Sequence, residues 1–262
     1  MKKILSLLLA VLVLGTCLAV LPSCSETKNE IILGFDAEYP PFGYLDEATG
    51  KYIGFDIEYA QKVCDNLGYT LKLSPIDWDA KDALLQSGAI DMIWNGFTYE
   101  GRENGYEWTD RYLNNSIVVL VAEGSGIATL TDLAGKTVAV QTDSSGESAL
   151  AKKTELVASL KDGKYLTEQA YTTAFEKLKT GAIDAIVVDV GVANYLTANN
   201  AGYTILAETV SSETYGVGFL KGNTELCAKI NAEMKNVAKD TAFITALCEK
   251  YGVDRNAFTL GK

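Results

Sequence analysis

Residues 85–96, LQSGAIDMIWNG, and residues 178–189, LKTGAIDAIVVD, are two versions of one pattern in this 262-residue chain. Each passes from an expected helix end through Gly-Ala-Ile-Asp into an apolar run and then to a polar or glycine position. The two copies start 93 residues apart, at Leu85 and Leu178. The repeat therefore predicts two α/β lobes with similar connectivity.

Strand and helix patterns alternate around both copies. Residues 55–67 predict a helix, because Ile57, Ala60, Val63, Cys64 and Leu67 share one face and Gly68 stands at the stop position. The expected strands are 31–35, 70–73, 90–94 and 137–140, and a further helix is expected over 80–87, ending at Gly88. Such alternation indicates βαβ units and a mainly parallel sheet.

Four loops are the expected ligand positions. In open α/β sheets, ligands lie outside the carboxyl ends of the strands. This rule selects the loops after residues 35, 94 and 140, together with Asp189 at the end of its strand. If the lobes face each other, these places converge on one cleft, and the repeat puts Gly96 and Asp189 at equivalent positions on its opposite walls.

The polar side chains of those loops match a ligand with one carboxylate and one ammonium. Arg102 offers a planar fork for a carboxylate, and Asp36 and Asp189 offer carboxylates for an ammonium. The neutral polar groups are those of Asn95, Thr98, Gln141, Ser144 and Ser145. Gly96 and Gly146 allow the backbone to approach a ligand closely, and Tyr39 and Trp78 offer flat apolar surfaces. Each also has an ordinary alternative: Arg102 as a solvated surface residue, Asp36 as a turn cap, Trp78 as core.

The first residues form an export signal. Lys2 and Lys3 precede a long apolar run, for which a retained membrane helix is the alternative. Leu21-Pro22-Ser23-Cys24 is similar to a bacterial lipoprotein cleavage motif, although Pro22 departs from it. Cys17 is the second candidate, but cleavage there would leave an apolar tail, whereas cleavage at Cys24 leaves a polar tether over 24–29. We therefore expect a signal peptide over 1–23 and an acylated Cys24 that anchors the protein to the outer face of a membrane.

The composition excludes several function classes. Loss of Lys2 and Lys3 leaves 21 basic and 34 acidic residues, a net charge of −13, which argues against nucleic acid. The chain has no histidine, so a His-based triad or His zinc site is excluded. Cys64, Cys227 and Cys248 form no CxxC motif; one disulfide with a free thiol and three free thiols both stay open.

Several segments resemble the periplasmic amino-acid-binding proteins of ABC importers, the solute-binding family with histidine-, glutamine- and cystine-binding members. The matching stretches are DAEYPPF at 36–42, GFDIE at 54–58, GFTYEGR at 96–102, GKTVAVQTDSS at 135–145 and DAIVVD at 184–189. The stretches follow the expected order, and the resemblance spans roughly residues 31–255. The segment from Thr98 to Arg102 is one residue shorter than the family's usual loop, and Gly101 is expected to allow the tighter path.

The resemblance implies a role for each candidate residue. Arg102, helped by Ser144 and Ser145, binds the α-carboxylate, and Asp189 binds the α-amino group. Asn95, Gly96 and Thr98 bind ligand polar atoms, Tyr39 and Trp78 flank the side chain, and Gln141 touches it. Asp36 either contacts the ligand or braces the site. No catalytic residue, metal ligand or cofactor is implied.

The resemblance also implies a two-lobed periplasmic-binding-protein-like (type II) α/β fold with two hinge strands, near 115–120 and 212–216. Lobe 1 is expected over 30–117 plus 214–262, and lobe 2 over 118–213. The implied function is capture of a free amino acid by hinge closure, and its delivery to an ABC transporter permease with its ATPase, by a monomer. Glutamine or cystine is favoured, and the Glu38 carboxylate keeps a basic amino acid open.

Two other classes of function compete with transport. One is an enzyme on the same scaffold, dehydratase-like, with Asp36, Glu38 or Glu100 as acid or base. The other is a sensor or lytic enzyme carrying this module; it is disfavoured because no appended catalytic or membrane domain is expected after residue 255.

Overall fold

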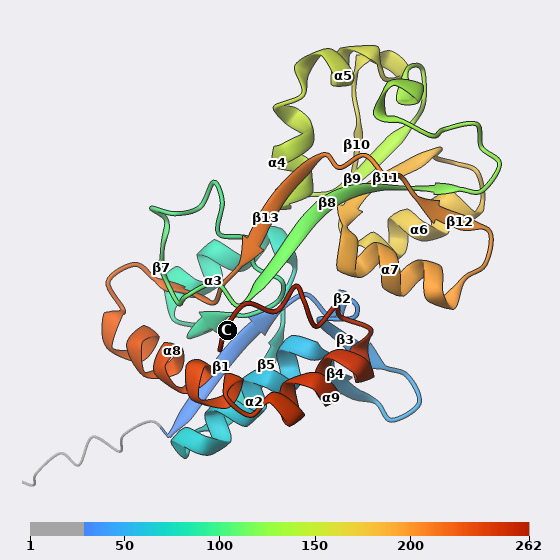
Figure 1. Ribbon diagram of the computed structural model, residues 1–262. Helices are drawn as coiled ribbons and strands as arrows, with labels where there is room; N and C mark the ends of the chain where they lie inside the picture. Colours follow the sequence, from blue (N-terminus) through green and yellow to red (C-terminus); the bar gives the residue numbers. More distant parts are fainter. Residues whose placement is uncertain (1–28, 262) are drawn as a thin grey trace, which may run out of the picture.

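The computed structural model of the protein describes residues 29–261 and has two lobes (Figure 1). The predicted signal peptide, Cys24 and all of the tether except Asn29 lie outside the described residues. Within residues 29–261, none of the helices combines the length and the apolar character needed to cross a membrane.

The first lobe is built on a five-stranded sheet of order β5-β1-β6-β14-β7. Its strands are β1 (Glu30–Phe35), β5 (Thr70–Pro75), β6 (Met92–Ile93), β7 (Tyr106–Trp108) and β14 (Gly218–Leu220). A small sheet, β2 (Glu38–Tyr39), β3 (Gly43–Asp46) and β4 (Lys51–Ile53), follows β1. The helices of the lobe are α2 (Phe55–Leu67), η1 (Trp78–Ala80), α3 (Lys81–Ser87), α8 (Thr224–Ala238) and α9 (Thr241–Tyr251).

The second lobe has a sheet of order β10-β9-β11-β8-β12, with β13 paired to β8. Its strands are β8 (Leu113–Ala122), β9 (Val138–Gln141), β10 (Leu166–Glu168), β11 (Ala185–Asp189), β12 (Tyr203–Ile205) and β13 (Ser211–Tyr215). The helices are η2 (Leu130–Leu133), α4 (Ser145–Ala151), α5 (Thr154–Ser159), η3 (Lys161–Gly163), α6 (Tyr171–Lys179) and α7 (Val190–Asn199).

The two lobes share the connectivity that the repeat predicts. In each, three parallel strands in the spatial order second-first-third are followed by an antiparallel strand: β5-β1-β6-β14 in one lobe and β10-β9-β11-β8 in the other. The Gly-Ala-Ile-Asp segments also turn in the same way, because Gly88 and Gly181 adopt φ values of 74° and 72°. Glycine takes this left-handed conformation without a Cβ penalty.

The predicted strand over 90–94 is wrong in length, since β6 pairs only at Met92 and Ile93. Side chains close the ladder at both ends: Asp91 accepts the Ile32 N–H at 2.8 Å, and Asn95 Oδ1 accepts the Asp36 N–H at 3.0 Å. The adjoining amides of β1 therefore bond to side chains instead of extending the backbone ladder.

Two antiparallel strands, β8 and β13, connect the lobes (Figure 1). Their register runs from Leu113 opposite Tyr215 to Ile117 opposite Ser211. Beyond Ile117, β8 continues as an inner strand of the second sheet, between β11 and β12. The predicted crossings at 115–120 and 212–216 lie on these two strands.

The chain returns to the first lobe after β13. There α8 and α9 pack against α2, and Tyr59 donates a hydrogen bond to the Met234 carbonyl at 2.8 Å. Cys64, Cys227 and Cys248 lie on these three helices, and each is buried with a free thiol. They therefore fill core space as small apolar side chains.

Candidate functional site

A small cavity lies between the lobes. It is lined by Tyr39, Trp78, Asn95, Gly96, Thr98, Arg102, Gln141, Ser144, Ser145 and Asp189. These are ten of the eleven predicted ligand-binding residues, and both lobes contribute to the wall. They meet because strands β1, β6, β9 and β11 all point their carboxyl ends at this space.

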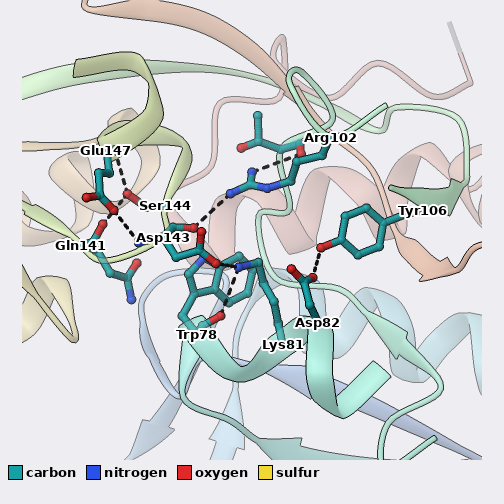
Figure 2. Close-up of polar contacts among 10 residues, drawn as sticks. Trp78, Lys81, Asp82, Arg102, Tyr106, Gln141, Asp143, Ser144 and Glu147 are labelled. Atoms are coloured by element: carbon teal, nitrogen blue, oxygen red, sulfur yellow. Dashed lines mark hydrogen bonds and ion pairs between the residues drawn. The ribbon is translucent and has the colours of Figure 1, made fainter. Parts of the chain in front are cut away.

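Arg102 reaches the cavity from a tight turn. Its N–H donates to the Tyr99 carbonyl at 3.0 Å, and Gly101 supplies the positive φ, 83°, that the turn requires. The guanidinium donates to the Thr98 carbonyl at 3.4 Å and, across the lobes, to the Asp143 carbonyl at 3.1 Å (Figure 2). A guanidinium has five N–H donors, so further donors are left for an anion.

Asp189 is a buried carboxylate at the end of β11, in the second lobe. Its Oδ1 accepts hydrogen bonds from Tyr215 Oη at 2.6 Å and from Asn115 Nδ2 at 2.8 Å. The Tyr215 proton is used in that bond, so Tyr39 Oη, 3.4 Å from Tyr215 Oη, is the donor between the two tyrosines. Two strands of the hinge thus hold the carboxylate in one orientation.

Glu213 is a second buried carboxylate beside Asp189. Its Oε1 accepts from Thr98 Oγ1 at 2.9 Å and from Asn115 Nδ2 at 2.8 Å, the same nitrogen that binds Asp189. Burial, followed by the Asp189 charge, raises the pKa of Glu213 to about 8. Two adjacent carboxylates with only neutral donors do not both ionise readily.

Asp36 braces the site and is not part of the cavity wall. Its Oδ2 accepts from Gln141 Nε2 at 2.6 Å, which joins the two lobes, and its Oδ1 accepts the Glu38 N–H at 2.8 Å. Burial is the main reason that the pKa of Asp36 is raised to about 6. Of the two roles expected for Asp36, the geometry favours bracing.

Gly96 allows a close approach of backbone and rings. It has a φ of 55°, and a Cβ at this position would lie 2.8 Å from Tyr39 Cε1. Its N–H donates to Asp56 Oδ2 at 2.6 Å, and Tyr112 Oη donates to the same carboxylate at 2.8 Å. Burial raises the pKa of Asp56 to about 7. Asp56 therefore positions the loop that carries Gly96.

Trp78 serves both as core and as cavity wall. Its ring meets Phe97 edge to face, with 5.6 Å between the ring centroids. Lys81 lies over the Trp78 ring, only 1% exposed, and donates to the Trp78 carbonyl at 3.3 Å. The Lys81 ammonium forms an ion pair with the Asp143 carboxylate of the other lobe (Figure 2).

Ser144 and Ser145 stand at the start of helix α4. Ser144 is the N-cap of α4, and its Oγ accepts the Glu147 N–H at 3.0 Å. Both serines line the cavity, so the start of α4 faces the space beside Arg102.

Sequence reasoning missed Glu213, Asn115, Tyr215, Lys81 and Asp56. Asn115 and Glu213 had a recognisable signal, because both are polar residues within or beside the predicted hinge crossings. Asp56 lies in the GFDIE motif but received no role. Tyr215 also lies within the predicted crossing at 212–216. Lys81 carried no local signal, since its partner Asp143 is 62 residues away in the chain.

Residues 31–254 match the model of the bacterial extracellular solute-binding proteins, family 3. The L-cystine-binding protein TcyJ of Escherichia coli K12 is 31% identical over 234 residues, which cover 87% of this chain and 85% of TcyJ. The ABC transporter glutamine-binding protein GlnH of Bacillus subtilis is 27% identical over 221 residues, covering 82% of this chain and 78% of GlnH.

Solved structures show the same fold. An ABC uptake transporter substrate binding protein from Streptococcus pneumoniae, with bound histidine, has a TM-score of 0.83 and 31% identity, covering 88% of this chain and 95% of that chain. An ancestral arginine-binding protein bound to glutamine has a TM-score of 0.78 and 35% identity, covering 86% and 99%.

Proposed function

Because the chain belongs to the bacterial extracellular solute-binding proteins, family 3, we propose that it captures a free amino acid between its lobes and delivers it to an ABC importer. The observation that carries the proposal is a pair of opposite charges on one cavity. Arg102 of the first lobe and Asp189 of the second line the same small cavity. A guanidinium and a carboxylate are the natural partners of an α-carboxylate and an α-ammonium.

The other lining residues complete the proposed site. Arg102, Ser144 and Ser145 hold the α-carboxylate, and Asp189 holds the α-amino group. Asn95, Gly96 and Thr98 supply further polar contacts, and Tyr39 and Trp78 flank the ligand side chain with Gln141 at its end. The Gln141 side-chain amide donates to Asp36, so Asp36 also orients this amide toward the ligand.

Closure of the lobes is the proposed mechanism of capture. Residues 30–117 and 214–262 form one rigid lobe and residues 118–213 the other, with bending at β8 and β13. A ligand that contacts both lobes binds the closed form better than the open form, so it shifts the population toward closure. The Gln141–Asp36 and Arg102–Asp143 hydrogen bonds are contacts between lobes that this closed arrangement adds.

Glutamine and cystine are the favoured ligands. The relatives that bind them, GlnH and TcyJ, support this choice together with a site whose residues offer amide and aromatic groups. The arginine-binding relative ArtP of Bacillus subtilis, 26% identical over 258 residues, supports a basic amino acid as the alternative.

A thermal-shift screen of ligand-stripped protein against the twenty amino acids and cystine tests the function. A ligand present at about 100 times its Kd adds about 2.7 kcal/mol to the free energy of unfolding. We expect a clear rise in Tm with one small group of amino acids. If none raises the Tm of correctly folded protein, amino-acid capture is wrong.

We further propose that the protein is not an enzyme. Its relatives are solute-binding proteins, which supports transport over a dehydratase-like activity. Burial favours protonation of Asp36, and its oxygens are occupied by Glu38 and Gln141, which makes it a poor general base.

Anchoring by acylated Cys24 on the outer face of the membrane is the proposed location. The extracellular character of the family supports export, and the Leu21–Cys24 motif supports acylation. Cys24→Ser is expected to release the protein from membranes in cell fractionation, while Cys17→Ser leaves it bound. The opposite result would move the anchor to Cys17.

A further inference from the structure

Glu213 is a buried ionisable group that the proposed capture mechanism does not use. It is 6% exposed and lies on hinge strand β13, while Asp189 ends β11 of the second lobe. Asn115 Nδ2, on hinge strand β8, donates at 2.8 Å to both carboxylates. One amide nitrogen therefore holds the two acidic side chains close together.

The surroundings of this pair provide no cation in contact. Among residues 29–261, the ion pairs include neither Asp189 nor Glu213. The donors to the pair, from Thr98, Asn115 and Tyr215, are all neutral. Two ionised carboxylates at this separation in a buried site would repel strongly, so the pair retains a proton.

The two acidic residues border different spaces. Asp189 lines the inner cavity, whereas Glu213 is one of the residues that line an open groove, here called the outer vestibule. Arg102, Lys152 and Lys153 also line the outer vestibule. Thr98, Arg102 and Ser145 line both spaces, so they form the partition between them. A proton on Glu213 thus has a route to solvent that does not pass through the bound ligand.

We propose that Asp189 and Glu213 share one proton in the ligand-free protein, and that docking of an amino-acid ammonium on Asp189 expels this proton from Glu213 into the outer vestibule. The inference rests on the proposed function, and it makes capture a proton-linked exchange. The ammonium replaces the proton as the positive charge that the two carboxylates require. Glu213 is then a positioning residue that acts through Asp189.

Other charged and titratable groups surround the pair. They are Arg102, Lys152, Lys153 and Glu100 around the outer vestibule, and Tyr39, Tyr171 and Tyr215 on the cavity side. Burial raises the pKa of each of the three tyrosines well above its usual value. Glu100 is held at the surface by the Thr214 N–H and hydroxyl, at 2.7 and 2.8 Å. Asp36 and Asp56, whose pKa values burial raises to about 6 and about 7, accept hydrogen bonds from Gln141 and from the Gly96 N–H of the cavity wall. Loss of the pH dependence in Glu213→Gln is therefore needed to assign it to the pair.

Isothermal titration calorimetry in two buffers of different ionisation enthalpy tests the exchange. The probe is the first of L-glutamine, L-cystine and L-arginine that binds. We expect wild-type protein to release about 0.5–1 proton per ligand at about pH 7. We also expect its affinity to rise by up to about 10-fold per pH unit between about pH 6 and 8, because the bound form carries one proton fewer.

Glu213→Gln separates this role from a structural one. Gln keeps an oxygen for Thr98 and Asn115 but carries no titrating proton, so we expect proton release near zero and less than about a 2-fold change in affinity per pH unit. Glu100→Gln, in the same vestibule, is the matched control and should keep the wild-type pH profile. Binding without proton release in the wild type overturns the exchange and leaves amino-acid capture standing, whereas failure of all twenty amino acids and cystine to bind overturns both.

Discussion

Asp91 and Asp184 make the same pair of hydrogen bonds in the two lobes. Each carboxylate accepts the backbone N–H of the first parallel strand at 2.8 Å, from Ile32 in one lobe and Thr137 in the other. The backbone N–H of Asp91 donates to the Ile32 carbonyl, and that of Asp184 donates to the Thr137 carbonyl, each at 2.8 Å. The aspartate of the repeated motif therefore ties the third parallel strand to the first.

Asp91→Ala and Asp184→Ala are expected to destabilise the protein alike. Each variant leaves a half-buried N–H without its acceptor, which costs about 1–3 kcal/mol in the free energy of unfolding. Urea denaturation measures this cost, and ligand affinity of the folded variants should stay unchanged. The Asn variants keep an oxygen and are the controls; if they lose as much stability as the Ala variants, the charge and not the hydrogen bond is responsible.

Arg102→Ala is expected to weaken amino-acid binding by about 100-fold or more, because a hydrogen bond to a charged group is worth about 1.5–3 kcal/mol and the α-carboxylate loses two such bonds from the guanidinium. Calorimetry measures the loss, and the Tm without ligand should change little. Arg111→Ala is the control, since Arg111 lies over the Tyr99 ring on the same loop but does not line the cavity. Near-wild-type affinity in Arg102→Ala would remove Arg102 from the site.

Lys81→Met and Asp143→Asn are expected to weaken binding about 3- to 10-fold without lowering the Tm of the ligand-free protein. The Lys81–Asp143 ion pair joins the lobes, so it stabilises the closed form only. Asp143 is half exposed, which limits the value of the pair to about 1 kcal/mol. A double-mutant cycle on ligand affinity measures the coupling, and strictly additive effects would show that the pair does not assist closure.

Thermal stability is expected to fall as the pH rises from about 4 to 7. Burial raises the pKa of Asp36 to about 6 and that of Asp56 to about 7. In this window the folded protein binds more protons than the unfolded chain, so the free energy of unfolding decreases with increasing pH. The two shifts together predict a loss of about 6 kcal/mol in the free energy of unfolding across the window, which is measured as a fall in Tm.

Asp56→Asn should flatten that pH profile, because Asn keeps an oxygen for the Gly96 N–H but does not titrate. Asp132→Asn is a suitable control, since hydrogen bonds from the Ala128 and Thr129 N–H groups lower the pKa of this exposed carboxyl. A wild-type Tm that rises between about pH 4 and 7 would show that neither buried aspartate retains its proton.

Local patterns in the sequence predicted the two lobes and most of the residues that line the cavity. The Gly-Ala-Ile-Asp repeat, the helix stops at Gly68 and Gly88 and the strand-end rule are local patterns, so they could be found without coordinates. Because parallel strands end at one edge of a sheet, polar residues just after them had to meet, and ten of the eleven predicted residues line the cavity. Gly101 likewise accounted for the short path to Arg102.

The contacts between charged residues that are distant in the chain could be found only in the folded structure. Asn115 bonds to Asp189, 74 residues away in the chain, and to Glu213, 98 residues away. Lys81 bonds to Asp143, which is 62 residues away. The short length of β6 also depends on such a contact. The Asn95 side chain accepts the N–H of Asp36, which directly follows β1 and is 59 residues away in the chain. A buried group's partner and its pKa depend on what lies beside it in space, and chain connectivity does not encode that distance.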